Sequence, residues 1–205
     1  MKKGLFVVLE GLDGAGTTTQ AELLAEFLRR RGETVVQTFE PTDRALGVAL
    51  RTALRGQWDS ESGELDPAAV ALLFAADRVD HGQTRIRPSV EAGQVVLSDR
   101  YVHSSFAYQG TLLPMEWVKA VNAYAVVPDL TLYVRVPVEV AMERLNKRGT
   151  TAEIYERKAM QERVFSAYED LFSPPQEGVF TVDGTRSADQ VHAAIVERIE
   201  PLLER

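Results

Sequence analysis

The sequence predicts an α/β fold in three layers, α/β/α, with a five-stranded parallel sheet flanked by helices. Two observations predict it. Short apolar runs rich in β-branched residues alternate along the chain with longer segments of helical periodicity. Some of these runs, such as residues 5–9 and 95–97, are continuously apolar, as buried parallel strands are. The 205 residues suit one domain, so we expect a single unit over residues 1–205.

The expected strands are short and carry many β-branched or aromatic residues. They cover residues 5–9, 34–39, 95–98, 130–136 and 179–182. The expected helices cover residues 18–31, 46–55, 67–92, 115–125, 138–148, 153–172 and 187–204. Gly32 follows three arginines and predicts the end of the first helix. Asp66 before Pro67 predicts an N-cap with proline in the first turn.

The bulk composition excludes several classes of function. A net charge of -7 argues against a protein that wraps nucleic acid, although local basic residues can still bind a small anion. The absence of cysteine removes disulfides and thiolate sites. The apolar run at residues 5–9 is too short for a secretion signal, and no stretch reaches the roughly 18 apolar residues of a membrane span. We therefore expect a cytoplasmic protein without nucleic-acid or membrane partners.

A glycine-rich segment follows the first expected strand. It reads Gly11-Leu12-Asp13-Gly14-Ala15-Gly16-Thr17-Thr18-Thr19. The pattern GxxxxGK[ST] between a strand and a helix forms a loop whose backbone N–H groups bind phosphate, and Gly11, Gly16 and Thr18 fit it. The following helix would direct its positive end at the same phosphate. The simpler alternative is a turn that binds nothing, because Thr17 stands where the pattern has lysine.

Two further groups of residues suggest binding chemistry. Asp99 and Arg100 follow the expected strand at residues 95–98, where an aspartate can interact with the shell of Mg²⁺ and an arginine can grip a phosphate. Phe74 and Arg78 are four residues apart on one helix face, and together they can stack on a planar base and hydrogen-bond its edge. Taken alone, the first pair fits a surface ion pair, and the second fits a core phenylalanine beside a solvated arginine.

Taken together, these segments resemble the thymidylate kinase family, in order and over nearly the whole chain. Residues 8–20 are similar to that family's EGxDGxGKTTQ loop apart from the lysine, and residues 72–78, LLFAADR, to its thymine-binding helix. Residues 99–110 resemble its DRYxxSxxAYQG segment, which is the most specific part. The resemblance implies a P-loop NTPase fold, with a single kinase domain and a short lid around residues 146–153.

The resemblance also implies an activity and its ligands: transfer of a phosphoryl group from Mg-ATP to dTMP in dTTP biosynthesis, by a homodimer. It assigns ATP binding to Gly11, Gly14, Ala15, Gly16, Thr17, Thr18, Thr19, Arg144, Asp183, Gly184 and Thr185. It assigns dTMP binding to Asp13, Pro41, Phe74, Arg78, Arg100, Ser105, Tyr108, Gln109 and Glu156. It places Mg²⁺ near Thr18, Asp99 and Asp13.

Several of these residues have specific roles in the family. Phe74 would stack on thymine, and Arg78 would bond its carbonyl edge. Arg100 would grip the acceptor phosphate, and Tyr108 would crowd the 2′ position of the sugar and favour deoxyribose. Asp13 would hold the 3′-hydroxyl close to the metal. The resemblance also implies that Arg144 would pack on the adenine of ATP, the phosphate donor.

Thr17 is the clearest departure from the family. Losing one well-placed charge donor costs roughly 2.7–4 kcal/mol of transition-state stabilisation, or about a hundred- to a thousandfold in rate. Lys147 and Arg148 in the lid are candidate substitutes and, with Asp13 and Arg100, candidate catalytic residues. Their alternative role is as solvated charges at a helix C-terminus.

Three functions therefore stay open. The first is an active thymidylate kinase with an altered phosphate loop, which the intact Asp13 and Asp99 favour. The second is a nucleotide-binding homologue that kept the dTMP pocket but lost the chemistry, which Thr17 favours. The third is a kinase for another deoxynucleotide.

Overall fold

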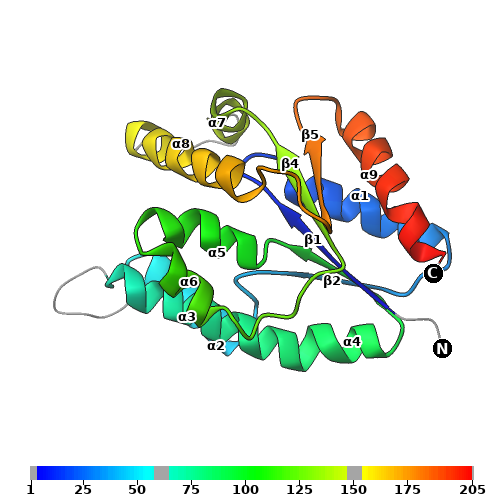
Figure 1. The fold of residues 1–205 in the computed structure, drawn as a ribbon, viewed down its shortest axis with the longest axis horizontal. Helices are drawn as coiled ribbons and strands as arrows, with labels where there is room; N and C mark the ends of the chain where they lie inside the picture. The colour runs from blue at the N-terminus through cyan, green and yellow to red at the C-terminus, as the bar shows by residue number, and fades with distance from the viewer. Residues whose placement is uncertain (1–3, 58–64, 147–153, 205) are drawn as a thin grey trace.

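The computed structural model describes residues 4–57, 65–146 and 154–204, except for the side chains of residues 154–157. Its strands are β1 (Leu5–Glu10), β2 (Val35–Phe39), β3 (Val95–Asp99), β4 (Leu130–Arg135) and β5 (Val179–Asp183). They form one parallel sheet in the order β2-β3-β1-β4-β5. Helices cover both faces of this sheet (Figure 1). The sheet confirms the predicted three-layer α/β class.

The helices lie close to their expected positions. The longer ones are α1 (Thr17–Arg30), α2 (Ala45–Leu54), α3 (Pro67–His81), α7 (Val138–Asn146), α8 (Ile154–Leu171) and α9 (Ala188–Leu203). The shorter ones are the π-helical turn η1 (Gly82–Ile86), α4 (Arg87–Glu91), α5 (Val102–Tyr108), the 3-10 turn η2 (Gln109–Thr111) and α6 (Met115–Val121). Within the described residues, no helix combines the length and apolar character needed to cross a membrane.

Two differences from the expected helices have simple causes. The single helix expected at residues 67–92 is divided by the π turn η1, which a period of 3.6 residues does not reveal. Helix α5 was not expected, because its seven residues are too few to show a clear period. Both predicted helix ends are confirmed: Asp66 accepts the backbone N–H of Ala68 over 2.8 Å, and Gly32 has a φ of +85°.

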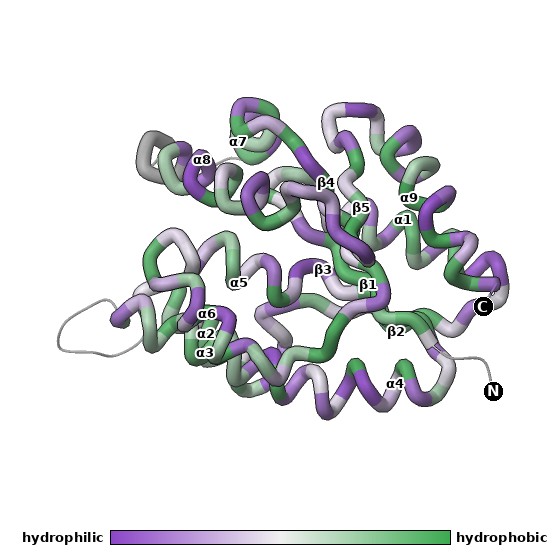
Figure 2. Tube along the Cα trace, in the orientation of Figure 1, coloured by the Kyte–Doolittle hydropathy of each residue, from purple (hydrophilic) through white to green (hydrophobic). Residues whose placement is uncertain are grey.

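Strand β1 is buried from both sides. Val7 and Leu9 pack in a large cluster with side chains of α1, α8 and α9, whereas Phe6 and Val8 pack in a smaller cluster with Ile86 and its neighbours. Figure 2 shows the hydrophobic residues concentrated along the central strands. Full burial of each such side chain contributes roughly 1.5–3 kcal/mol. The end of β1, where the phosphate loop begins, is therefore fixed in position.

The strand register brings the polar strand ends together. Leu9 of β1 pairs with Asp99 of β3, and Phe39 of β2 pairs with the same Asp99. The carboxyl ends of three neighbouring strands thus meet at one edge. Ligands of open parallel sheets bind at this edge, and every cavity of the candidate site borders it.

Candidate active site

The phosphate loop joins β1 to α1 through two glycines in the left-handed conformation. Gly14 has a φ of +87° and Gly16 a φ of +99°, which side-chain-bearing residues rarely adopt. A Cβ on Gly14 would also lie 2.5 Å from the carbonyl oxygen of Ala141. The chain therefore turns sharply at the start of α1, where unpaired backbone N–H groups and the helix dipole favour a bound phosphate.

A possible magnesium position lies between the loop and β3. The Thr18 hydroxyl donates to Asp99 Oδ2 over 2.5 Å, and Asp99 Oδ1 is buried without a hydrogen-bond partner. Hydroxyl and carboxylate oxygens are ligands that Mg²⁺ accepts along with waters and phosphate oxygens. The described part of the chain holds no group of three or more carboxylates or histidines arranged for a metal. Thr18 and Asp99 therefore fit a magnesium ion that shares its shell with a nucleotide phosphate.

Thr17 stands at the lysine position of the loop and is 6 % exposed. It lines a cavity beside the loop, the phosphate-loop cavity, together with Leu12, Asp13, Gly14, Gly16, Thr18, Thr19, Asp99, Arg100 and Leu145. Among these described residues, Arg100 alone carries a positive charge. The loop thus keeps its shape but lacks the ammonium group that stabilises the β and γ phosphates in related loops.

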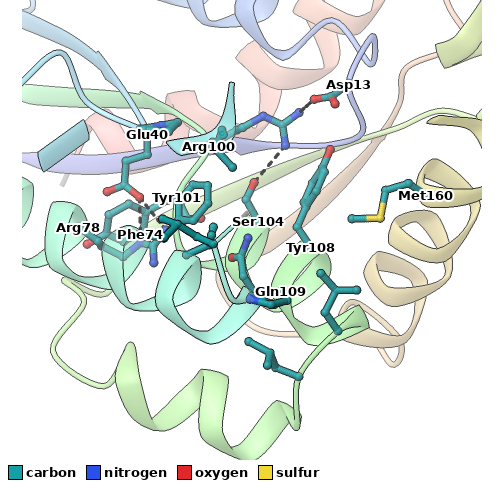
Figure 3. Close-up of a pocket in the computed structure, with 17 residues that line it drawn as sticks. Asp13, Glu40, Phe74, Arg78, Arg100, Tyr101, Ser104, Tyr108, Gln109 and Met160 are labelled. Atoms are coloured by element: carbon teal, nitrogen blue, oxygen red, sulfur yellow. Dashed lines mark hydrogen bonds and ion pairs between the residues drawn. The ribbon is translucent and has the colours of Figure 1, made fainter. Parts of the chain in front are cut away.

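A second and larger cavity of about 440 Å³ lies between α3, α5 and α8 (Figure 3). Its apolar wall consists of Pro41, Leu54, Leu65, Pro67, Val70, Phe74, Tyr101, Leu112, Leu113 and Met160. Its polar groups belong to Asp13, Glu40, Arg78, Arg100, Ser104, Tyr108 and Gln109. A mostly apolar wall with a few convergent polar groups suits a small planar ligand that carries a charged group.

Asp13 and Arg100 line both of these cavities. Arg100 Nη2 donates to Asp13 Oδ1 over 2.6 Å, and its guanidinium lies 5.3 Å from the centre of the Tyr108 ring. Burial raises the pKa of Tyr108 to about 12, so its phenol stays neutral at physiological pH. Arg100 therefore presents a fixed positive charge to both cavities, and Figure 3 shows its guanidinium bonded to Asp13 and Ser104.

Arg78 lies on the wall of the large cavity in a buried ion pair. It is 1 % exposed, its Nε donates to Glu40 Oε2 over 2.9 Å, and its Nη1 donates to the side-chain oxygen of Asn122. Glu40 Oε1 lies 2.9 Å from Nδ1 of His81, whose Nε2 lies 2.7 Å from the Thr38 hydroxyl. The alternative of a solvated arginine is therefore wrong, and no sequence pattern indicated that Glu40 anchors Arg78.

A third cavity, the Arg144 cavity, shares Gly14, Gly16 and Thr19 with the phosphate-loop cavity. Its remaining lining residues are Ala15, Gln20, Val134, Arg144, Gly184, Arg186, Ala188 and Val191. Arg144 donates to the carbonyl oxygens of Ala15 and Gly184 over 3.0 and 2.8 Å. These bonds fix the guanidinium plane as a wall, and such a plane can stack on a base.

The turn at residues 183–185 contributes to the Arg144 cavity through Gly184 alone. Asp183 Oδ1 accepts the backbone N–H and the hydroxyl of Thr185 over 3.0 and 2.6 Å. These bonds lower the pKa of Asp183. Asp183 and Thr185 therefore shape the turn that presents Gly184, and neither lines the cavity as it stands.

The other predicted residues divide into three groups. Pro41, Phe74, Tyr108 and Gln109 line the large cavity. Ser105 does not: it is buried off the wall, and Ser104 lines the cavity instead. The reason is helical phase, because Ser104 and Tyr108 are four residues apart and share one face of α5.

Lys147 and Arg148 lie outside the described residues, as does the side chain of Glu156. Gly11 lies off the cavity walls, and a Cβ there would meet the carbonyl oxygen of Val134 at 2.8 Å.

Sequence reasoning missed several residues of the site. Gln161 of α8 donates to Asp13 Oδ2 over 3.2 Å, and Met160 beside it lines the large cavity. Tyr101 and Ser104 also reach that wall. For the last two, the DRYxxSxxAYQG segment was the available signal, because Tyr101 and Ser104 occupy its first Y and its S. Gln161 lies in a helix far along the chain, and no motif marks it.

A glycine-rich loop between strand and helix, with cavities on its flanks, defines a nucleotide-binding protein of the P-loop class. Comparison with known proteins narrows the class. The model of the family described as thymidylate kinase matches residues 9–195. The chain belongs to the thymidylate kinase family.

Individual relatives agree over nearly the full length. A protein of Thermococcus gammatolerans named "Probable thymidylate kinase" is 40 % identical over 201 residues, which cover 96 % of each chain. Another of Thermococcus onnurineus, with the same name, is 40 % identical over 98 % of this chain and 100 % of its own. The "Thymidylate kinase" of Bifidobacterium longum subsp. infantis is 38 % identical over 98 % of this chain and 88 % of its own.

Proposed function

We propose that this protein transfers the γ-phosphoryl group of ATP to the phosphate of dTMP, giving dTDP and ADP. One observation carries the proposal: Asp13 and Arg100 line both the phosphate-loop cavity and the large cavity. A donor phosphate held by the loop and an acceptor phosphate held in the large cavity would meet at this pair. An oxygen of the dTMP phosphate then attacks the γ-phosphorus, and the bond from that phosphorus to the β–γ bridging oxygen breaks.

The large cavity supports a deoxynucleoside monophosphate as the acceptor. Phe74 offers a ring for the base, and Arg78 offers a donor whose position is fixed by Glu40. Tyr108 lies beneath the Arg100 guanidinium, so the sugar of a ligand whose phosphate contacts Arg100 would lie near this ring. The apolar wall suits a base that carries a methyl group.

The loop and the Arg144 cavity support ATP as the donor. Backbone N–H groups of the loop would bind the phosphates, and the Arg144 guanidinium would stack on the adenine. Thr18 and Asp99 would hold Mg²⁺, which when bound neutralises phosphate charge. Catalysis in this reaction consists mostly of alignment and charge stabilisation, so the positions of Arg100 and Asp13 matter most.

In the proposed enzyme, a cation of the lid, Lys147 or Arg148, would replace the missing lysine. Two alternatives to this enzyme stay open, and the geometry favours neither of them over it. A catalytically impaired homologue would bind dTMP without rapid turnover. A kinase for another deoxynucleotide would use the same cavities and differ in the ranking of its acceptors.

The test is ADP formation with Mg-ATP and dTMP, for the unchanged chain and for Thr17→Lys, alongside a panel of other deoxynucleotides. Turnover of the unchanged chain with dTMP ranked first supports the proposal. Loss of that turnover in Lys147→Ala or Arg148→Ala would identify the substitute cation. No turnover in the unchanged chain or in Thr17→Lys, with dTMP still bound, would show that the protein binds dTMP without acting as a kinase, and would overturn the proposal.

We also propose that the protein forms a homodimer and that it is located in the cytoplasm. Leu72 and Val79 are exposed apolar side chains of α3, and they line a hollow with Ala76 and Val121. A second copy of the chain would bury them. Light scattering on the unchanged chain and on Leu72→Asp tests this part, since a monomeric mass for the unchanged chain would refute it.

A further inference from the structure

Glu10 is a buried carboxylate at the end of β1 that no ligand role explains. It has no exposed surface, and it lies on the wall of none of the three cavities. Burial raises the pKa of Glu10 above its ordinary value in spite of several hydrogen bonds. A buried carboxylate is costly unless its oxygens have partners. The partners of Glu10 therefore indicate what the residue does.

The Glu10 carboxylate caps helix α5 from the neighbouring strand. Its Oε1 accepts the backbone N–H groups of Tyr101 and Ser104 over 3.0 and 3.2 Å. Tyr101 is the N-cap residue of α5, and Ser104 is the third residue of that helix. The Tyr101 N–H is thus among those that a helix start leaves unpaired, whereas the Ser104 N–H is shared with the Tyr101 carbonyl oxygen, to which it donates over 3.1 Å. The Tyr101 side chain caps neither N–H. Glu10 performs the task of an N-cap serine or aspartate.

The same bonds hold Arg100 in an unusual backbone conformation. Arg100 has a φ of +70°, the only positive value at a non-glycine position among the described residues. Its backbone N–H donates to the carbonyl oxygen of Leu9 over 2.8 Å, and its own carbonyl oxygen accepts the Ser98 hydroxyl over 2.8 Å. The next N–H along the chain, that of Tyr101, donates to Glu10. The left-handed residue is therefore held by hydrogen bonds on both sides, and on its C-terminal side they come from the Ser98 hydroxyl and from Glu10.

A second chain of bonds joins Glu10 to the Arg100 side chain. Glu10 Oε2 accepts the Ser104 hydroxyl over 2.6 Å, and Arg100 Nη1 donates to the Ser104 oxygen over 3.2 Å. Tyr168 of α8 donates to the same Oε2 over 2.9 Å and fixes the carboxylate from the opposite element. One carboxylate thus links β1, α5 and α8 to the guanidinium at the junction of the cavities.

We infer that Glu10 is a positioning residue for the acceptor phosphate: by capping α5 it holds Arg100 so that its guanidinium points at the junction with Asp13. The inference rests on the proposed function, in which Arg100 grips the phosphate of dTMP. Glu10 acts through Arg100 and touches no substrate itself. A carboxylate serves all of these donors with two oxygens, whereas an amide offers one oxygen and brings two hydrogens of its own.

Glu10→Gln, which keeps the side-chain size, tests the inference by calorimetry. The Kd for dTMP should rise about tenfold, as expected when charge-assisted bonds behind one ligand-binding group are weakened. The Kd for a non-hydrolysable ATP analogue should stay within about twofold, because Arg144 and the loop do not depend on α5. In an Arg100→Ala background, Glu10→Gln should have no further effect on dTMP, because the group it positions is gone. Equal effects in both backgrounds would overturn the inference.

Asp129→Asn is the matched control. The Asp129 carboxylate also accepts a backbone N–H of β1, that of Phe6 over 2.9 Å, but at the opposite end of the strand. This variant should lower the unfolding temperature and leave the Kd for dTMP unchanged. An equal rise in the Kd for dTMP in Asp129→Asn and Glu10→Gln would reduce the role of Glu10 to general stability and overturn the inference.

Amide resonances give a readout that needs no substrate. An N–H bonded to a carboxylate resonates downfield, so the Tyr101 and Ser104 amide protons should move upfield in Glu10→Gln. Unmoved resonances would overturn the capping role. If the unchanged protein binds no dTMP, the proposed function fails, and these two resonances still decide whether Glu10 holds the backbone at Arg100.

Discussion

Arg100 and Asp13 form an ion pair of 2.6 Å between residues that are 87 positions apart in the sequence. Asp13 follows β1 and Arg100 follows β3, and the parallel pairing of these strands brings the two together. The Asp13 side chain is 52 % exposed, and exposed pairs contribute little to stability. The pair is better explained by function, because an entering phosphate can take the place of Asp13 as the partner of the guanidinium.

Arg100→Lys tests whether the site needs the two parallel hydrogen bonds that a guanidinium can form with a phosphate. Lysine keeps the charge but cannot form the two parallel bonds that arginine offers a phosphate. We expect kcat/KM for dTMP to fall about a hundredfold, with little change in the unfolding temperature. A coupled assay of ADP formation measures the first, and a thermal melt the second.

Arg135→Lys is the control for that variant. Arg135 also forms an exposed ion pair, with three hydrogen bonds to Glu169, but it lines none of the three cavities. Its replacement should leave kcat/KM unchanged. A similar loss in both variants would point to a general effect of arginine replacement and remove the role given to Arg100.

Gln161 is predicted to hold Asp13 in place for the reaction. Its amide donates to Asp13 Oδ2 over 3.2 Å, and its own oxygen is buried without a hydrogen-bond partner. Gln161→Leu should lower kcat about tenfold, since Asp13 loses a donor worth roughly 1.5 kcal/mol. The unfolding temperature should stay nearly constant, because leucine replaces a half-satisfied amide. Gln176→Leu, which removes an exposed amide bonded to the Leu171 carbonyl oxygen, should change neither value. An unchanged kcat in Gln161→Leu would contradict the prediction.

The parts of this molecule that follow local patterns could be predicted from the sequence. The runs at β1 and β3 are apolar because both sheet faces are covered, and the loop shows its glycines at fixed spacing. Partners that depend on tertiary pairing could not. Glu40 reads as a polar residue after a strand, and its partner Arg78 is 38 positions away. The expectation for Ser105 failed by one residue, because its face on α5 depends on where that short helix begins.

The buried pair of Arg78 and Glu40 should matter for both stability and binding. Arg78→Met would leave the Glu40 carboxylate buried with His81 as its remaining side-chain partner among the described residues. Breaking such a pair costs roughly 3–5 kcal/mol of unfolding free energy. Urea unfolding of the variant and the unchanged chain measures this loss. A loss below about 1 kcal/mol would show that the pair does not hold α3 to the end of β2.

The double variant Arg78→Met, Glu40→Gln separates stability from recognition. Removing the second charge should restore part of the unfolding free energy, because no unpaired carboxylate remains buried. The affinity for dTMP should stay low if Arg78 itself bonds the base. Recovery of dTMP affinity together with stability would assign Arg78 a structural role alone.

His103 should make the folded state sensitive to acid. Its ring on α5 lies against Phe106 and Phe172, and burial lowers the pKa of His103 from 6.5 to about 4. Between these values the unfolded chain takes up a proton that the folded chain does not. The contribution is therefore fully present above pH 6.5 and is lost as the pH falls toward 4, with a slope of up to about 1.4 kcal/mol per pH unit.

His103→Phe removes this titration and keeps a ring between the two phenylalanines. Urea unfolding at pH 7, 6 and 5 should show a smaller fall in free energy for the variant than for the unchanged chain. The raised pKa of Glu10 acts in the opposite direction, because a carboxyl that is protonated more readily when folded gains stability in acid. That effect is common to both chains and cancels in their difference. Parallel curves for the two chains would mean that His103 takes up its proton equally well in the folded state, which the packing of its ring argues against.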